Sequence, residues 1–196
     1  MKKLSRASLL GMSLLLGACS ILPSAPAVDT YQLPPSTGNL QVRGLPLSLM
    51  VATPYANRYL NHQRLVVVKQ NHEVQAYAGM RWEDELPIVF RNRLIDDLRR
   101  AQAYRTIVND KTSVVTDRSL RTDIQAYQIQ FSDQQAFAII SVDANLYNNA
   151  TSTVIDSRRF SVNAPLKTVE LSEVVPTLAA LNEQINAQII QWAVAK

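Results

Sequence analysis

The chain has one cysteine, two histidines and five glycines among its 196 residues, and these low counts exclude several kinds of chemistry. A single cysteine forms neither a disulfide nor a thiolate metal cluster within the chain. His62 and His72 lack the H-x-x-x-H and H-E-x-x-H spacings of zinc sites, so we interpret them as polar loop residues. No glycine-rich phosphate loop and no G-x-S-x-G nucleophile motif occurs. We therefore expect no cofactor, no metal and no enzymatic activity.

The one cysteine, Cys19, follows Leu16-Gly17-Ala18 behind a basic start and an apolar run over residues 7–16. This order is typical of a bacterial lipoprotein signal, and the apolar run is too short for a transmembrane helix. We expect residues 1–18 to be removed as a signal peptide and Cys19 to carry acyl chains such as palmitate. An ordinary secretory signal with an incidental cysteine is the alternative. Residues 19–30 would then form the acylated, flexible tether.

Lipidation of Cys19 would anchor the mature chain to a membrane surface without spanning it. In Gram-negative bacteria an Asp after the lipidated cysteine favours retention in the inner membrane. Ser20 stands there, so we expect the periplasmic face of the outer membrane. Lys2, Lys3 and Arg6 leave with the signal, which reduces 20 basic residues to 17 against 16 acidic ones. The mature charge of +1 argues against a nucleic-acid partner.

Residues 31–196 are predicted to form a single α+β domain whose sheet is mostly antiparallel. Every second side chain over residues 136–146 is apolar, as on the buried face of a strand, while the other face starts apolar and turns polar. The segment before it changes parity between Ala126 and Tyr127, which predicts a bulge or strong bend. The three consecutive strands expected at 120–131, 136–146 and 153–162 are predicted to form an antiparallel meander. Strands are expected at 45–52, 64–69, 74–77, 104–108, 120–131, 136–146 and 153–162.

Two long amphipathic helices are predicted, one from about Glu83–Glu85 to Ala101 and one over residues 172–193, and both are expected to pack on one face of the sheet. The acids at the start of the first helix suit its dipole better than they suit a metal or catalytic cluster. The apolar stripe of the second helix is interpreted as core, although a lipid groove is the alternative. The wetter faces of the first helix carry Arg91, Arg93, Asp96, Asp97, Arg99 and Arg100.

Four residues are candidates for contact with a partner protein. Arg81 and Trp82 are adjacent, and such a pair either stacks to pin a sheet edge or offers an anchor to a partner. Tyr55 and Tyr59, with Leu60 beside them, lie in a predicted loop. They form either a flap over the core or part of an interaction surface.

The whole mature chain resembles the ABC-type transport auxiliary lipoprotein family, which includes the PqiC-type intermembrane transport lipoproteins. The most specific part is Tyr77-Ala78-Gly79-Met80-Arg81-Trp82, followed by acids and Pro87, although Glu83 stands where a small residue is expected. The other matching features are the lipobox at Cys19, Tyr31-x-Leu33, Leu49-Met50-Val51-x-x-Pro54, and a terminal helix with Ala180-Leu181-Asn182 and Trp192.

This resemblance implies a non-enzymatic accessory subunit of an MCE-type lipid transporter. In such systems an ABC permease and ATPase in the inner membrane work with an MCE-domain protein that bridges the periplasm, and the lipoprotein serves the outer-membrane end. It also implies a homo-oligomer. Two alternatives remain open: a lipid-carrying or envelope-assembly lipoprotein of another pathway, and a tethered hydrolase, for which no nucleophile and base can be named.

Overall fold

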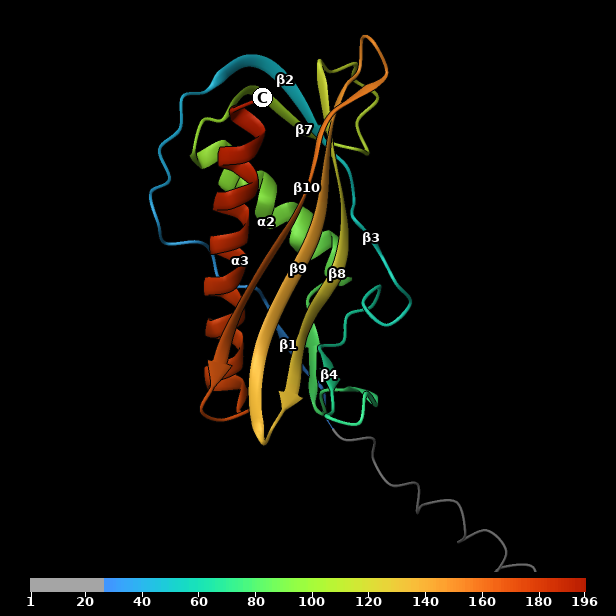
Figure 1. Cartoon of the computed structure of the whole chain (residues 1–196), viewed down its shortest axis with the longest axis vertical. Helices are drawn as coiled ribbons and strands as arrows, with labels where there is room; N and C mark the ends of the chain where they lie inside the picture. Colours follow the sequence, from blue (N-terminus) through green and yellow to red (C-terminus); the bar gives the residue numbers. More distant parts are fainter. Residues whose placement is uncertain (1–26) are drawn as a thin grey trace, which may run out of the picture.

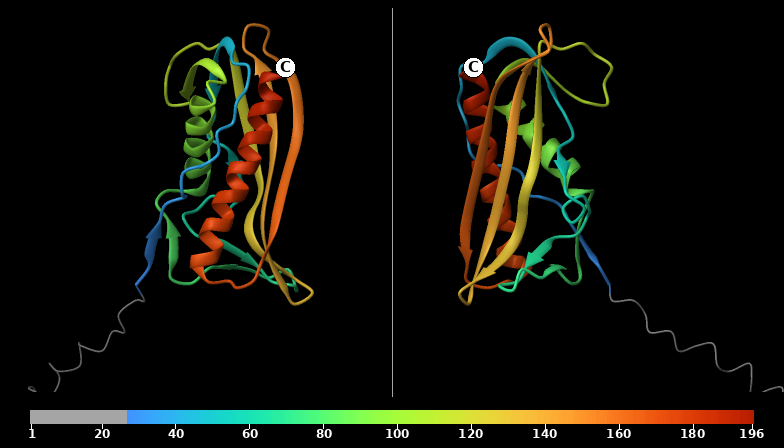
Figure 2. Two further views of the ribbon diagram at one scale, coloured as in Figure 1. Left: turned by 90° about the vertical axis from the view of Figure 1, so that its left-hand side faces the viewer. Right: turned by 45° about the vertical axis from the view of Figure 1, so that its right-hand side comes forward.

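The computed structural model describes residues 27–196, so Cys19 and the predicted signal peptide lie outside the described residues. The described chain is a curled, mixed sheet with two helices on one side (Figures 1 and 2). The order of strands in the main sheet is β10-β9-β8-β2-β7, with short strands added along β8.

Three long antiparallel strands form the predicted meander. They are β8 (Arg118–Ser132), β9 (Gln135–Asn148) and β10 (Thr153–Leu166). Ile140 of the central strand β9 lies opposite Tyr127 of β8 and Val162 of β10, and all three side chains are buried. Every second residue of β9 is buried as the alternation predicts: Ala136, Ala138, Ile140, Val142, Ala144 and Leu146.

The predicted bulge is present in β8. The register with β9 shifts between Ile124 and Ala126, which lets both Ile124 and Tyr127 face the core although three positions separate them. The hairpin from β8 to β9 turns through Asp133 and Gln134, both at positive φ (48° and 64°). Two such residues are what a two-residue hairpin turn matched to the sheet twist requires.

The prediction of a mostly antiparallel sheet is wrong, because the sheet is mixed. Strand β2 (Leu45–Val51) runs parallel to both β7 (Tyr104–Asn109) and β8. The chain between β2 and β7 contains a helix that returns it to the same end of the sheet, so the two strands point the same way.

Four short strands complete the sheets. Strands β3 (Tyr55–Ala56) and β4 (Val66–Val68) lie parallel along β8, and β5 (Val74–Ala76) pairs antiparallel with β4. A separate two-stranded sheet joins β1 (Asp29–Tyr31) to β6 (Met80–Trp82) in parallel.

Both predicted helices are present, α2 over Leu86–Arg100 and α3 over Leu171–Val194. The apolar residues predicted for their stripes are buried, and Trp192 of α3 packs edge-on against Phe160 of β10 with ring centroids 5.7 Å apart. One residue departs from the prediction. Arg91 is only 4% exposed instead of lying on a wet face. It follows Pro87 by one helical turn and precedes Leu94 by another, so it faces inward with them.

The chain from β1 to β2 crosses both helices as a strap. The backbone amides of Thr37 and Gly38 donate to the Glu183 carboxylate of α3 at 2.9 and 2.6 Å. Ser36 Oγ and Asn186 Nδ2 donate to Asp97 Oδ2 of α2 at 2.9 and 2.7 Å. The pKa of Asp97 is raised above its ordinary value, because the effect of burial outweighs that of these two hydrogen bonds, which lower the pKa. The strap therefore ties β1 to the helical layer.

Candidate interaction surfaces

The two ends of the described domain are formed by different segments of the chain. Residue 27, strand β1 and the β4–β5 hairpin lie at the lower end of Figure 1, and this end is called the tether end. The loop of residues 110–117, the turn between β9 and β10 and the last turn of α3 lie at the upper end. A partner of the tether end and a partner of the upper end would therefore meet different surfaces.

The structure separates Arg81 from Trp82, because adjacent strand residues point to opposite faces. Trp82 is 1% exposed and meets Tyr127 edge-on, with ring centroids 6.2 Å apart. Arg81 is exposed, and its Nε donates to Thr30 Oγ1 of the neighbouring strand at 2.9 Å. Trp82 thus pins β6 to the core and is inaccessible to a partner in this structure, whereas Arg81 is accessible.

Tyr55 and Tyr59 are both exposed, at 72% and 63%. Tyr59 lies in a turn held by Asn57, whose Oδ1 accepts from the amides of Tyr59 and Leu60 at 3.0 and 3.1 Å. Leu60 is buried and anchors the turn in the core. The turn consequently holds the Tyr59 ring out from the surface.

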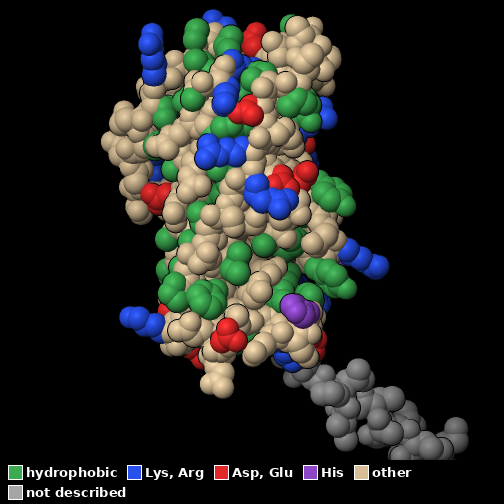
Figure 3. Space-filling view, viewed as in Figure 1, with side chains coloured by type: hydrophobic (Ala, Val, Ile, Leu, Met, Phe, Trp, Pro, Cys, Tyr) green, Lys and Arg blue, Asp and Glu red, His purple; other side chains and the backbone are tan. Residues whose placement is uncertain are grey.

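Tyr59 borders a hollow of about 560 Å³ at the tether end, which we call the basic hollow. An adjoining hollow of about 710 Å³ shares three of its residues and is bordered by Val28, Arg81, Asp84 and Glu85 among others. Figure 3 shows a histidine and hydrophobic side chains close to the start of the grey segment. The basic hollow is lined by Arg58, Tyr59, His62, Arg64, Val66, Val74, Gln75 and Ala76. No carboxylate is among these residues.

The upper end carries exposed apolar side chains. We call Val114, Val115 and Val154 the valine tip; they are 55%, 94% and 53% exposed. Asn149 of the β9–β10 turn fastens the loop to the hairpin, since its Nδ2 donates to the Thr116 carbonyl at 2.9 Å and to Thr116 Oγ1 at 3.0 Å. Val114 and Val115 therefore sit on a loop that is hydrogen-bonded to the β9–β10 turn, and Val154 lies at the start of β10.

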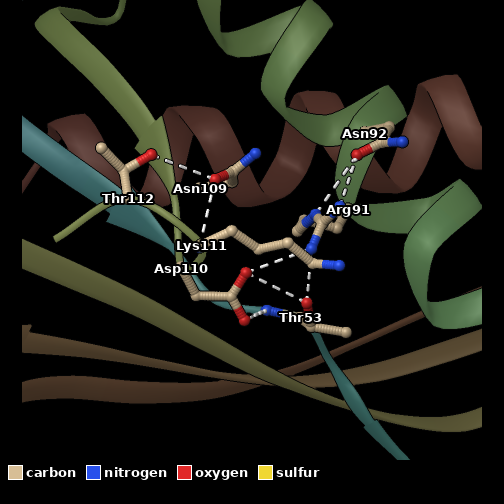
Figure 4. A network of polar contacts seen from close by, with 7 residues as sticks. All are labelled: Thr53, Arg91, Asn92, Asn109, Asp110, Lys111 and Thr112. Carbon is tan, nitrogen blue, oxygen red and sulfur yellow. Dashed lines mark hydrogen bonds and ion pairs between the residues drawn. The ribbon is translucent and has the colours of Figure 1, made fainter.

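The other end of this loop is held by an ion pair between the buried Arg91 and the partly exposed Asp110 (Figure 4). Arg91 Nη1 of α2 donates to Asp110 Oδ1 at 3.1 Å and to Thr53 Oγ1 at 2.5 Å. The Thr53 amide donates to Asp110 Oδ2 at 2.7 Å. The network joins the ends of β2 and β7 to α2. The spacing of four residues from Pro87 was the signal in the sequence that could have predicted the burial of Arg91.

Within residues 27–196, no three His, Cys, Asp or Glu side chains gather closely enough to hold a metal ion. Neither α2 nor α3 is long and apolar enough to cross a membrane.

Comparison with known proteins identifies both a family and a fold. The family model described as ABC-type transport auxiliary lipoprotein component matches residues 31–190. A crystal structure from Xanthomonas campestris, attributed to the DUF330 family, has a TM-score of 0.72 at 20% identity and covers 85% of this chain and 95% of its own. An uncharacterized protein of known structure has a TM-score of 0.66 at 18% identity, covering 85% and 98%. No curated protein matches the chain.

Proposed function

Because the chain belongs to the family of ABC-type transport auxiliary lipoproteins, we propose that it is a non-enzymatic accessory subunit of an ABC transporter that moves lipid between the two membranes. In this proposal the acylated Cys19 holds the domain on the periplasmic face of the outer membrane. The domain then docks the periplasm-spanning MCE-domain protein, which works with the ABC permease and ATPase. The observation that carries the proposal is the family match over residues 31–190.

The arrangement of the two ends supports this assignment. The described chain begins at one end of the domain, so an anchor before it would leave the other end free to point into the periplasm (Figure 1). That end carries the valine tip, with Val115 94% exposed on a loop fixed at both feet. Exposed apolar side chains on a fixed loop are typical of a protein contact. We propose that the valine tip contacts the MCE-domain protein and that Tyr55 adds a second contact.

The packing of α3 argues against the lipid-carrier alternative. Leu181, Ile185 and Ile189 are at most 4% exposed, because the helix lies against β9 and β10. The stripe that could have formed a lipid groove is therefore filled by the domain's own side chains. The basic hollow and its neighbour at the tether end are bordered by charged residues, which do not suit acyl chains.

Site-specific photocrosslinking tests the proposed contact. A photoreactive amino acid at Val115 in the acylated protein should crosslink to an MCE-domain protein in intact envelopes, identified by mass spectrometry after affinity purification. The same group at Gln125, which is exposed on the outer face of the sheet, serves as the control. Recovery of this chain alone from both positions, together with stoichiometric lipid, would favour the carrier instead. Crosslinks to further copies of this chain would support the homo-oligomer that we also propose.

A further inference from the structure

We propose that the basic hollow binds the phosphate groups of phospholipid headgroups in the leaflet that holds the anchor, so that this side of the domain lies against the membrane. The inference rests on the lipid anchor of the proposed function. It goes further in assigning a second, non-covalent membrane contact to Arg58, Arg64 and Tyr59. Three independent features of the structure support it.

The first feature is unneutralised positive charge. Arg58 and Arg64 border the hollow and have no acidic partner within 4.0 Å in residues 27–196. Lys69 beside the β4–β5 turn, by contrast, is paired with Glu73 at 3.2 Å. Two free guanidinium groups on one hollow favour an anion, and guanidinium binds phosphate oxygens in bidentate geometry.

The second feature is the type of side chain that lines the hollow together with these arginines. The Tyr59 ring is 63% exposed and Val74, on the same hollow, is 39% exposed. A tyrosine has an apolar ring and a polar hydroxyl, which is why tyrosine is enriched at membrane–water interfaces. A hollow that combines arginine, tyrosine and valine matches the boundary between headgroup and acyl chain.

The third feature is the reach of the tether. Ala27 follows Cys19 by eight residues, and a fully extended chain spans at most about 3.6 Å per residue, or about 29 Å. Val28 borders the adjoining hollow, which shares His62, Arg64 and Ala76 with the basic hollow. The basic hollow therefore lies on the part of the surface that the anchor keeps nearest to the bilayer.

The two hollows are not equivalent, and their charges decide which one meets the membrane. Asp84 and Glu85 border the adjoining hollow, and Arg81 already donates to Thr30 there. Carboxylates would repel headgroup phosphates, so the adjoining hollow is the poorer site. The contact thus orients the domain with the turn of residues 57–62 and β5 toward the lipid.

Fluorescent labels on the full acylated protein test this orientation. Acylation blocks the one native thiol, so a single added cysteine is labelled selectively. A neutral environment-sensitive fluorophore is attached through Val74→Cys or, as the control, through Val115→Cys at the opposite end. The protein is then studied in vesicles of phosphatidylethanolamine and phosphatidylglycerol and in dodecyl maltoside micelles, which contain no phosphate. We expect acrylamide quenching at position 74 to fall several-fold in vesicles relative to micelles, and quenching at position 115 to stay unchanged.

Charge variants show whether the arginines cause the protection. The double variant Arg58→Gln and Arg64→Gln should restore quenching at position 74 in vesicles. Arg43→Gln with Arg105→Gln, two exposed arginines outside the basic hollow, should leave the protection intact. If the control pair removed the protection as well, general attraction would explain the result and the assigned site would be overturned.

Flotation of the vesicles separates failure of this inference from failure of the anchor. Protein that does not float with the vesicles contradicts the proposed lipid anchor itself. Protein that floats while position 74 stays fully accessible overturns the membrane contact and leaves the anchor standing. Protection of position 74 only after an MCE-domain protein is added would identify the basic hollow as a protein interface and would also overturn the inference.

Discussion

Trp192 Nε1 donates a hydrogen bond of 2.9 Å to Asp156 Oδ2, which fastens the last turn of α3 to the edge strand β10. Lys196 Nζ lies 2.7 Å from the same oxygen. The hydrogen bond from Lys196, followed by that from Trp192, lowers the pKa of Asp156 from 3.8 to about 2. One carboxylate therefore closes the upper end of the helix onto the sheet.

This arrangement predicts an acid-sensitive contribution to stability. The folded pKa of Asp156 lies below its unfolded value, so its contribution is complete above pH 3.8 and is lost as the pH falls toward about 2. Asp156→Asn should lower the melting temperature at neutral pH and reduce the loss of melting temperature between these two pH values. Thermal melts across the range test this, with the exposed Asp96→Asn as the control. Equal acid slopes for wild type and Asp156→Asn would contradict the prediction.

The core assignment of α3 predicts that Leu181→Asp unfolds the domain. Leu181 is 4% exposed, so the change removes a buried leucine and buries an unpaired carboxylate, at a cost of more than about 4 kcal/mol. Ala180→Asp is the matched control, because Ala180 is the residue next to Leu181 in the same helix but its side chain is exposed. Circular dichroism should show a folded Ala180→Asp and an unfolded Leu181→Asp. A stable Leu181→Asp would mean that this face of the helix is not part of the core.

The Arg91–Asp110 pair predicts a different pattern of mutational effects. Asp110→Ala leaves the buried guanidinium without its partly exposed counter-charge and should lower the free energy of unfolding by about 2 kcal/mol. Arg91→Met combined with Asp110→Ala removes both charges and should recover most of the loss. Chemical denaturation of both variants and of Arg91→Met alone measures the coupling. If the losses of the two single variants simply added in the double variant, the pair would not act as a unit.

The sequence predicted the elements that depend on local periodicity. Alternation over residues 136–146 revealed the central strand, and the change of parity near Ala126 revealed the bulge within about one residue. The parallel strand pairs were not predicted, because β2 and β7 are brought together by a long crossover that leaves no local pattern in the sequence. Strands β3 and β6, of two and three residues, were not predicted, because so short a segment shows no period of its own.

The candidate surfaces were predicted only in part for a similar reason. Tyr59 and Arg81 were recognised as unusual residues, but the basic hollow also needs Val74 and Gln75 from β5, which only the pairing of β4 with β5 brings beside the turn of residues 57–62. Arg91 was misread as a surface residue, because a charged side chain beside an apolar stripe is usually exposed. Its partners Thr53 and Asp110 lie at the ends of two parallel strands whose pairing the sequence did not reveal.

Two changes at the tether separate anchoring from the choice of membrane. Cys19→Ala behind an ordinary cleavable secretory signal should give a folded protein in the soluble periplasmic fraction, because each acyl methylene that is lost removes about 0.8 kcal/mol of membrane affinity. Its melting temperature should match that of wild type while transport is lost. Ser20→Asp should keep the acyl chains but retain the protein in the inner membrane. Fractionation and an assay of envelope integrity test both variants. Full function of the soluble Cys19→Ala protein would refute the need for an anchor, and full function of Ser20→Asp at the inner membrane would refute docking at the outer one.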